Sequence, residues 1–142
     1  MVEYLVGAAL GIASAGLAHL VGFDRSRSFY PVLLIAIASY YVLFAAMAGA
    51  TSALWLEVAI SGAWVLAAVK GFRSNLWIVV AGLAAHALFD AVHGTLVGTL
   101  VGTSGVPRWW PGFCLAFDLT IAAYAAFRIR AAGEPPEGAG RP

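Results

Sequence analysis

The sequence predicts an all-α integral membrane protein, a bundle of five transmembrane helices. Apolar residues make up 62% of the 142 residues and charged residues only 11%, whereas a soluble domain carries about a quarter charged residues. The apolar residues also fall in long runs, and about 20 residues of helix cross the ~30 Å hydrocarbon core of a bilayer. This composition leaves too little polar surface to cover a water-facing globule.

Each predicted span has a signal at one of its ends. The first span stops at the polar segment DRSRS, and Pro31 falls in the first turn of the second span, where a missing N–H does no harm. Ser52 is a candidate N-cap for the third span, and the fourth begins near Asn75. Trp109 and Trp110 introduce the fifth span at the membrane interface. The predicted spans are residues 2–23, 29–50, 52–70, 75–98 and 111–130.

Basic residues between the predicted spans indicate how the chain crosses the membrane. They occupy the connections between spans 1 and 2 and between spans 3 and 4, and they follow span 5, so they share one side. Arg108 is the single basic residue of the connections on the opposite side. Because basic loops remain in the cytoplasm, we expect an outside N-terminus and a cytoplasmic C-terminus. The residues on the shared side are Arg25, Arg27, Lys70, Arg73, Arg128 and Arg130.

The chain is expected to form one transmembrane domain over residues 1–130. The segment that follows, residues 131–142, reads AAGEPPEGAGRP. Its content of proline, glycine and polar residues is typical of disordered segments, and the orientation makes it a cytoplasmic tail.

The charge balance limits the partners of this chain. A net charge of +1 argues against a nucleic-acid partner, which would need a concentrated basic face. The predicted spans make membrane lipid the expected surrounding partner. The single cysteine, Cys114, cannot form an internal disulfide and leaves the redox compartment open.

A short repeat near the end of the fourth span places glycines four residues apart, at Gly94, Gly98 and Gly102. Such a smooth helix face lets a neighbouring helix approach closely. The face could pack within the chain, belong to a glycine-rich outer loop, or join copies of the chain into a homo-oligomer.

Ionisable residues cluster inside the predicted spans. His86, Asp90 and His93 follow the spacing H-x3-D-x2-H, which places them within about 60° of one another on one helix face. Glu57 lies on the third span and Asp118 on the fifth. Counted from the outer ends of the spans, the three carboxylates lie about 8–10 Å deep. We therefore expect them to share one layer of the outer leaflet, with the histidines beside them.

This cluster predicts a metal site. An intramembrane acid costs about 2.5–3.5 kcal/mol and persists only when it is paired, protonated or liganded. No lysine or arginine lies at this depth, and a set of imidazoles and carboxylates suits Zn, Fe or Mn. The predicted ligands are His86, Asp90, His93, Asp118 and Glu57. A protonic carboxyl–imidazole site, or hydrogen bonds that only fix helix packing, remain as alternatives.

Several further side chains are placed relative to this cluster. Cys114 and Ser61 share helix faces with the predicted ligands, and the two mid-span tyrosines could line a pocket beside them. His19 lies near the other end of the first span, where we expect it to contact Asp24 instead. The candidate supporting groups are Ser61, Cys114 and Tyr40.

These motifs resemble an uncharacterised family of small bacterial polytopic membrane proteins. The likeness covers the C-terminal half, in the segment HALFDAVH (His86–His93) and in the later Cys-x3-Asp element. The family carries a tryptophan where this chain has Phe89 and a second histidine where it has Gly94. The resemblance implies a multi-pass protein of a bacterial inner membrane and implies no reaction. It also implies one site that contains His86, Asp90, His93 and Asp118.

Three functions fit these observations. The first is a metal-dependent enzyme acting on a lipid-like or quinone-like molecule from the outer leaflet, with Glu57 and Asp118 as candidate catalytic groups. Glu57 would be a further ligand or the general base. The second is a small transporter coupled to protons or metal ions, and the third is a non-catalytic subunit of a membrane assembly. The inner halves of the last three spans are apolar, which favours a site open to one side over a transport path.

Overall fold

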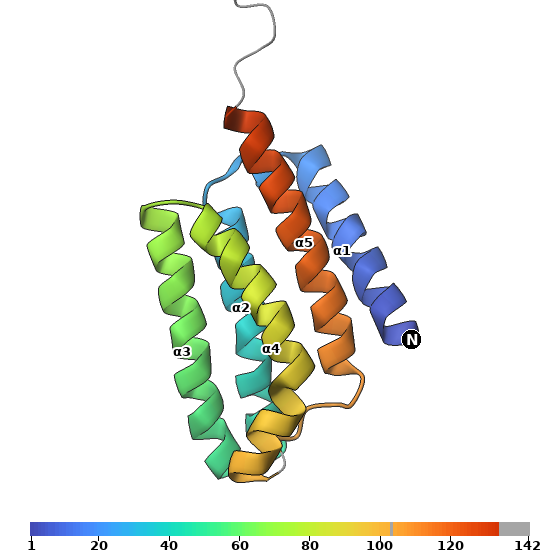
Figure 1. The fold of residues 1–142 in the computed structure, drawn as a ribbon, viewed down its shortest axis with the longest axis vertical. Coiled ribbons are helices and arrows are strands. Elements are labelled where there is room, and N and C mark those ends of the chain that lie inside the picture. The colour runs from blue at the N-terminus through green and yellow to red at the C-terminus, as the bar shows by residue number, and fades with distance from the viewer. Residues whose placement is uncertain (103, 134–142) are drawn as a thin grey trace, which may run out of the picture.

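The computed structural model describes residues 1–102 and 104–133, and within them the chain is all-α, with five helices long and apolar enough to cross a membrane (Figure 1). The predicted all-α class and the predicted number of membrane-length helices are confirmed. A short 3-10 helix, η1, follows the first long helix. The elements are α1 (Val2–Val21), η1 (Phe23–Arg25), α2 (Phe29–Met47), α3 (Thr51–Arg73), α4 (Trp77–Val101) and α5 (Trp110–Gly133).

The helix ends follow local backbone requirements. α1 ends at Gly22, which has the left-handed φ of 81° that glycine adopts easily. α3 continues past the predicted stop at residue 70 to Arg73. Gly71 in this last turn lets α4 approach closely, since a Cβ there would lie 2.4 Å from a methyl carbon of Val79. α5 continues to Gly133, so the first residues of the predicted tail are helical. The rest of that tail, residues 134–142, lies outside the described residues.

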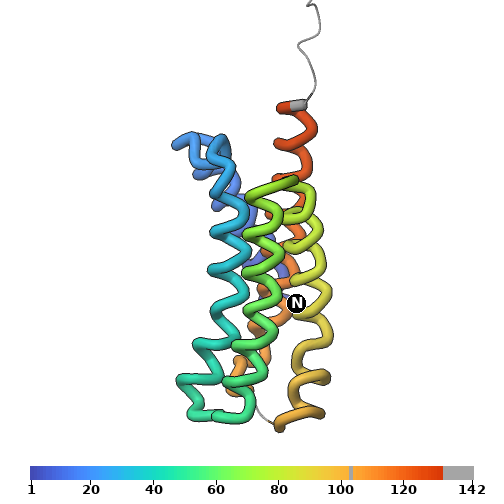
Figure 2. The backbone as a smooth tube through the Cα atoms, turned by 90° about the vertical axis from the view of Figure 1, so that its left-hand side faces the viewer, coloured from blue at the N-terminus to red at the C-terminus, as the bar shows by residue number. Residues whose placement is uncertain are grey.

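The helices alternate in direction, and they pack as a group of three with a pair at one side. α2, α3 and α4 contact one another, α5 packs along α4, and α1 packs along α5 on its outer side. Figures 1 and 2 show α2, α3 and α4 running side by side, with α5 between them and α1. α4 is therefore the helix that faces α3 and α5 at once.

Two glycines of α1 make its contact with α5. A Cβ at Gly7 would lie 2.2 Å from the carbonyl oxygen of Phe113, and one at Gly11 would lie 2.9 Å from the Thr120 side chain. This Gly-x3-Gly spacing is the small-residue contact of membrane helices. The glycine repeat singled out in the sequence behaves differently, because a Cβ at Gly94 or Gly98 would meet no described atom within 4 Å.

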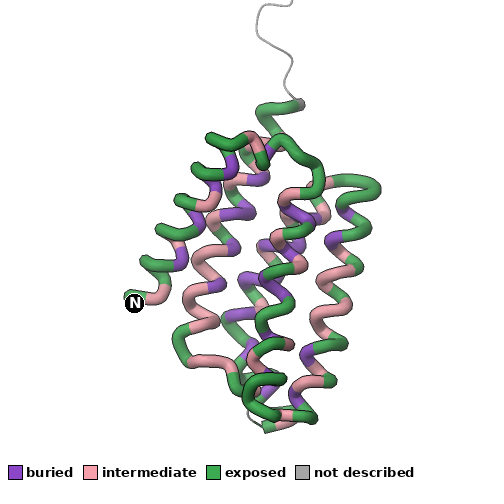
Figure 3. The backbone as a smooth tube through the Cα atoms, turned by 180° about the vertical axis from the view of Figure 1, so that it is seen from behind, coloured by how far each residue is buried: buried purple, intermediate pink, exposed green. Residues whose placement is uncertain are grey.

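The distribution of polarity is that of a membrane protein. Large apolar side chains such as Leu66, Leu88 and Phe127 are more than 60% exposed on the outer faces of the bundle. Ionisable side chains lie inside instead, at Asp24, Glu57, His86, Asp90, His93 and Asp118. Figure 3 shows the buried positions turned toward neighbouring helices, while most of α1 faces outward. This arrangement is suited to a hydrocarbon solvent.

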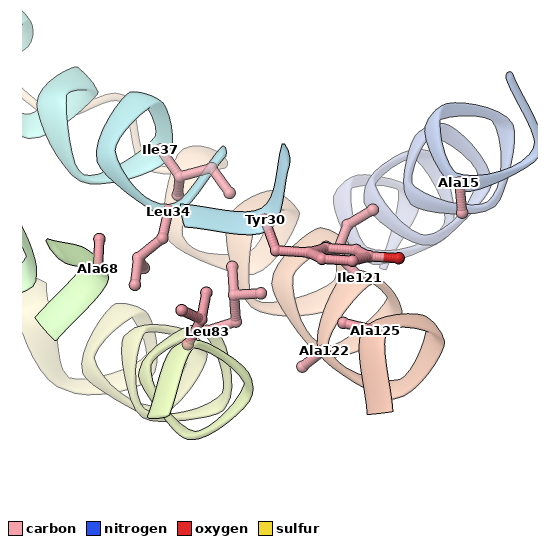
Figure 4. Close-up of a cluster of buried hydrophobic side chains, with 10 residues drawn as sticks. Ala15, Tyr30, Leu34, Ile37, Ala68, Leu83, Ile121, Ala122 and Ala125 are labelled. Atoms are coloured by element: carbon pink, nitrogen blue, oxygen red, sulfur yellow. The ribbon is translucent and has the colours of Figure 1, made fainter. Parts of the chain in front are cut away.

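An apolar cluster fills one half of the bundle. It takes side chains from all five long helices, including Leu34 of α2, Leu83 of α4 and Ile121 of α5, each 0% exposed (Figure 4). These residues come from the parts of the helices next to the α1–α2 and α3–α4 connections. The polar interior residues other than Asp24 therefore lie beyond this cluster, toward the opposite end.

The basic connections gather at the end of the bundle next to the apolar cluster. Arg27 donates hydrogen bonds of 2.7 and 2.9 Å to the carbonyl oxygens of Phe72 and Ser74, which joins the α1–α2 connection to the end of α3. The N–H groups of Arg27 thereby satisfy carbonyls that a helix end leaves without partners.

Asp24 of η1 binds the end of α5. Its Oδ2 accepts a hydrogen bond of 2.8 Å from the Tyr124 hydroxyl and lies 2.9 Å from Nε of Arg128. The expected contact with His19 is confirmed at 3.1 Å. Burial by itself raises the pKa of the Asp24 carboxyl, but the hydrogen bonds from Tyr124 and His19 and the charge of Arg128 outweigh it. The pKa of Asp24 is therefore lowered from its ordinary value.

Candidate metal centre

Three buried ligand groups from α4 and α5 converge in the interior. Nδ1 of His86 lies 2.8 Å from Oδ2 of Asp118 and 3.5 Å from Oδ2 of Asp90. His86, Asp90 and Asp118 each offer a ligand atom, and these atoms all lie within 4.8 Å of one another. The three side chains are 0–1% exposed. His86 and Asp90 meet because they are four residues apart on one helix face.

Tyr41 of α2 fixes the orientation of Asp90. Its hydroxyl donates a hydrogen bond of 2.5 Å to Oδ1 of Asp90, which leaves Oδ2 turned toward His86. The tyrosine ring stacks on His93 with centroids 4.0 Å apart. Tyr41 therefore contacts both Asp90 and His93 on the inner face of α4.

Glu57 and His93 form a second group. Oε1 of Glu57 lies 2.6 Å from Nε2 of His93, and both side chains are about 1% exposed. At this distance a hydrogen bond joins the carboxylate to the imidazole. The pair joins α3 to α4, whereas the group of three joins α4 to α5.

Aromatic rings enclose both groups. Trp64 of α3 presents its ring edge-on to His86, with centroids 5.2 Å apart. Phe89 lies between the histidines on α4 and contacts His93 at 5.3 Å. These rings exclude water and so strengthen electrostatic interactions inside the site.

Several polar atoms of the site are buried without a hydrogen-bond partner in the described part of the chain. Leaving such a group unsatisfied costs about 1–3 kcal/mol, and more when it is charged. Both groups contain these atoms, so each has unused capacity to bind an ion or a water molecule. The atoms are Oε2 of Glu57, Nε2 of His86, Oδ2 of Asp90, Nδ1 of His93 and Oδ1 of Asp118.

The site lies at the end of the bundle away from the basic connections. Glu57 is about two turns from the start of α3, Asp118 about two turns from the start of α5, and Tyr41 about two turns from the end of α2. Glu57, Asp118 and Tyr41 therefore lie at similar heights along the bundle.

The predicted cluster divides into two groups. His86, Asp90 and Asp118 lie together as a possible metal-binding group, whereas Glu57 and His93 pair with each other. The repeat on α4 cannot distinguish the two histidines, because seven residues bring the helix back to nearly the same face. The neighbouring helices make the difference, since one histidine meets α5 and the other meets α3.

The predicted supporting residues take different places. Cys114 is buried one turn before Asp118, and with Tyr40 it lines an apolar cavity of about 250 Å³ between α2 and α5. Tyr40 is 43% exposed and packs on Phe44 and Trp110. Neither Tyr40 nor the half-buried Ser61 makes a hydrogen bond to either group in the described part of the chain.

Tyr41 is a contact that the sequence-based prediction missed, because it named the neighbouring Tyr40 instead. A signal for it exists in the buried stripe of α2, where Leu34, Ile37, Tyr41 and Ala45 recur at spacings of three and four. Tyr40 falls off that stripe. The stripe assigns Tyr41 to the interior, although it does not identify Asp90 as the partner.

Comparisons with protein-family models, with curated proteins and with solved structures found no match to this chain.

Proposed function

We propose that this chain is a multi-pass membrane protein that binds a divalent metal ion through His86, Asp90 and Asp118. The observation that carries the proposal is a buried charge without a counter-charge. Two carboxylates face one imidazole, and no lysine or arginine pairs with them among the described residues. A divalent cation would balance both carboxylates and leave the imidazole neutral, which is the form that ligates a metal.

The spacing of the ligand atoms suits a small ion. Ligands about 2.1 Å from a tetrahedral metal lie roughly 3.4 Å apart, which matches the 3.5 Å between Nδ1 of His86 and Oδ2 of Asp90. The 2.8 Å between Nδ1 of His86 and Oδ2 of Asp118 is a hydrogen-bond distance, which a bound ion would widen. One nitrogen and several carboxylate oxygens favour Zn, Fe or Mn. Oδ1 of Asp118, which has no hydrogen-bond partner among the described residues, provides a further position for the same ion.

A catalytic role would use the two groups together. The ion would polarise a substrate held against Asp118, and Glu57, positioned by His93, would take up a proton as a general base. The apolar cavity that Cys114 and Tyr40 line lies one turn from Asp118 and suits a lipid-like or quinone-like molecule. This part of the proposal assigns a substrate class and no particular reaction.

The site would lie in the outer leaflet of a bacterial inner membrane. Support comes from the basic connections, which gather at one end of the bundle while the site lies toward the other. With the basic end in the cytoplasm, the N-terminus is outside and the C-terminus inside. A fluorescent protein fused after Pro142 should then mature in the cytoplasm.

A transporter is the less well supported function. Transport requires polar access from both ends, and the apolar cluster around Leu34, Leu83 and Ile121 closes the bundle on the basic side. Proton flux into liposomes would test this alternative. A flux that Glu57→Gln and Asp118→Asn abolish would favour transport over a one-sided site.

Metal content of the purified protein tests the proposal. Full-length protein in detergent should carry one equivalent of metal after growth in supplemented medium, and His86→Ala and Asp90→Ala should carry none. His19→Ala is the matched control, because that histidine lies at the basic end of the bundle. Asp118→Asn provides a nearly isosteric variant if an alanine variant fails to fold. Wild-type protein without stoichiometric metal would overturn the proposal.

A further inference from the structure

A cavity with several polar residues in its lining lies at the basic end of the bundle. It has a volume of about 320 Å³, and η1, the α1–α2 connection, the start of α4 and the end of α5 form its walls. Its lining includes Arg25, Ser26, Arg27, Tyr30 and Arg128. It shares no residue with the candidate metal centre.

The charge of this cavity is positive on the side that a ligand can reach. Arg25 and Arg27 are exposed. The Arg25 side chain makes no hydrogen bond or ion pair to any described residue, whereas the Arg27 guanidinium donates from Nε and Nη2 to the carbonyls of Phe72 and Ser74 and has its remaining N–H groups for a ligand. Arg128 is 27% exposed in its side chain. The one acidic residue of the lining, Asp24, has a side chain that is 0% exposed and is held by Arg128. Its Oδ1 is buried and lacks a hydrogen-bond partner in the described part of the chain, as does the hydroxyl of Tyr30.

Tyr30 contributes an unused donor to the same cavity. The residue is 3% exposed, and its hydroxyl has no hydrogen-bond partner within residues 1–102 and 104–133. Figure 4 shows its ring extending from α2 toward α5 with the hydroxyl at the far end. Ser26 adds a second hydroxyl to the lining. Hydroxyl and guanidinium donors together are a phosphate-binding set.

The cavity lies where lipid headgroups would meet the protein. Leu76 and Ile129 line the cavity, and the next residues along the chain are Trp77 and Arg130. The Arg130 guanidinium lies 5.4 Å from the centroid of the Trp77 ring. Tryptophan and arginine at a helix end are typical of the headgroup region. Basic pockets between helices on the cytoplasmic side bind anionic headgroups.

We infer that this cavity binds the phosphate group of a membrane phospholipid, with Arg25, Arg27 and Tyr30 as its donors. The acyl chains would extend along the apolar surface of α5, beside Ile129. Free phosphate has the same chemistry, but the position of the cavity at the end of membrane-length helices selects the lipid as its source.

Native mass spectrometry of the full-length protein in detergent tests this inference. Dioleoyl phosphatidylglycerol should remain bound, whereas dioleoylglycerol, with the same chains and no phosphate, should not. Arg25→Gln should weaken phosphatidylglycerol binding roughly fivefold, the contribution expected of one basic residue near a lipid surface. Tyr30→Phe should weaken it as well without lowering Tm, because its hydroxyl bonds to no described residue.

Arg108→Gln is the matched control, since Arg108 is an exposed arginine from the connection between α4 and α5 and should leave binding unchanged. Equal binding of the two lipids would overturn the inference, as would equal losses in Arg25→Gln and Arg108→Gln. Binding of inorganic phosphate in preference to phosphatidylglycerol would overturn the lipid as the source.

Discussion

Tyr41→Phe removes a single oxygen atom from the candidate metal centre and leaves the ring in place. The lost hydroxyl donates the 2.5 Å hydrogen bond to Oδ1 of Asp90, which holds the other oxygen toward His86. The remaining phenyl ring keeps its stacking on His93. The variant therefore tests the orientation of Asp90 separately from the packing of the bundle.

The size of the effect follows from the kind of bond that is lost. A hydrogen bond to a charged acceptor contributes about 1.5–3 kcal/mol, and each 1.4 kcal/mol is tenfold in an equilibrium constant. Outer partners of metal ligands contribute about 10–100-fold in affinity. We therefore expect Tyr41→Phe to bind metal roughly 10–100-fold more weakly than the wild type.

A competition titration against a chromogenic zinc chelator, on protein purified in detergent, measures this Kd. Tyr40→Phe is the matched control, because the neighbouring tyrosine packs on Phe44 and Trp110 and makes no hydrogen bond to Asp90. An unchanged Kd in folded Tyr41→Phe would refute the reasoning, and so would an equal loss in Tyr40→Phe.

Three further substitutions test other contacts. Glu57→Gln should retain one equivalent of metal by elemental analysis, because Glu57 lies outside the group of three ligands. Asp24→Asn should lower Tm at pH 7. Its difference from the wild type should shrink below about pH 4, because a lowered pKa gives stability above the unfolded-state value that is lost as pH falls through the folded-state value. Gly7→Ala should lower Tm, because its Cβ would lie 2.2 Å from the Phe113 carbonyl oxygen, whereas Gly16→Ala, in open space, should not.

Each of these outcomes has a clear opposite. Metal loss in Glu57→Gln would place Glu57 among the ligands. A Tm difference for Asp24→Asn that stays constant down to pH 3 would show that the charge of Asp24 is not what stabilises η1 on α5. Equal Tm changes in the two glycine variants would contradict a close approach of α1 to α5 at Gly7.

Much of the fold could be predicted from the sequence because bilayer thickness dictates helix length. Five apolar runs of that length leave few alternatives, and the structure contains five such helices among its described residues. The helix ends were less predictable. The third span is predicted to end at residue 70, yet α3 continues through Gly71 to Arg73. Gly71 lies against Val79 of α4, a contact that the sequence pattern does not reveal.

The membership of the site could be predicted better than its arrangement. The cost of burying acids identifies Glu57, Asp90 and Asp118 as residues that need partners. It does not say which partner each one takes, because that depends on how α3 and α5 are placed around α4. Helix neighbours are set by contacts such as Gly7 against Phe113, which carry no chemical signature in the sequence.

Charge counting distinguishes the two groups of the site and leads to a final test. One carboxylate, that of Glu57, faces the imidazole of His93, whereas two carboxylates, those of Asp90 and Asp118, face the imidazole of His86. On the proposed function a divalent cation supplies this balance, and removal of the bound ion should destabilise the fold. Adding a chelator should lower the Tm of the wild type by several degrees.

Asp118→Asn should remove this sensitivity. The variant leaves one carboxylate and one imidazole, the same balance as in the Glu57–His93 pair, and it no longer requires an ion. Its Tm should be the same with and without chelator and should equal or exceed that of the chelated wild type. Asp24→Asn is the matched control, because it changes a buried aspartate at the other end of the bundle and should remain chelator-sensitive. If the chelator lowers the Tm of Asp118→Asn as much as that of the wild type, the ion is held elsewhere and the assignment of the group of three is wrong.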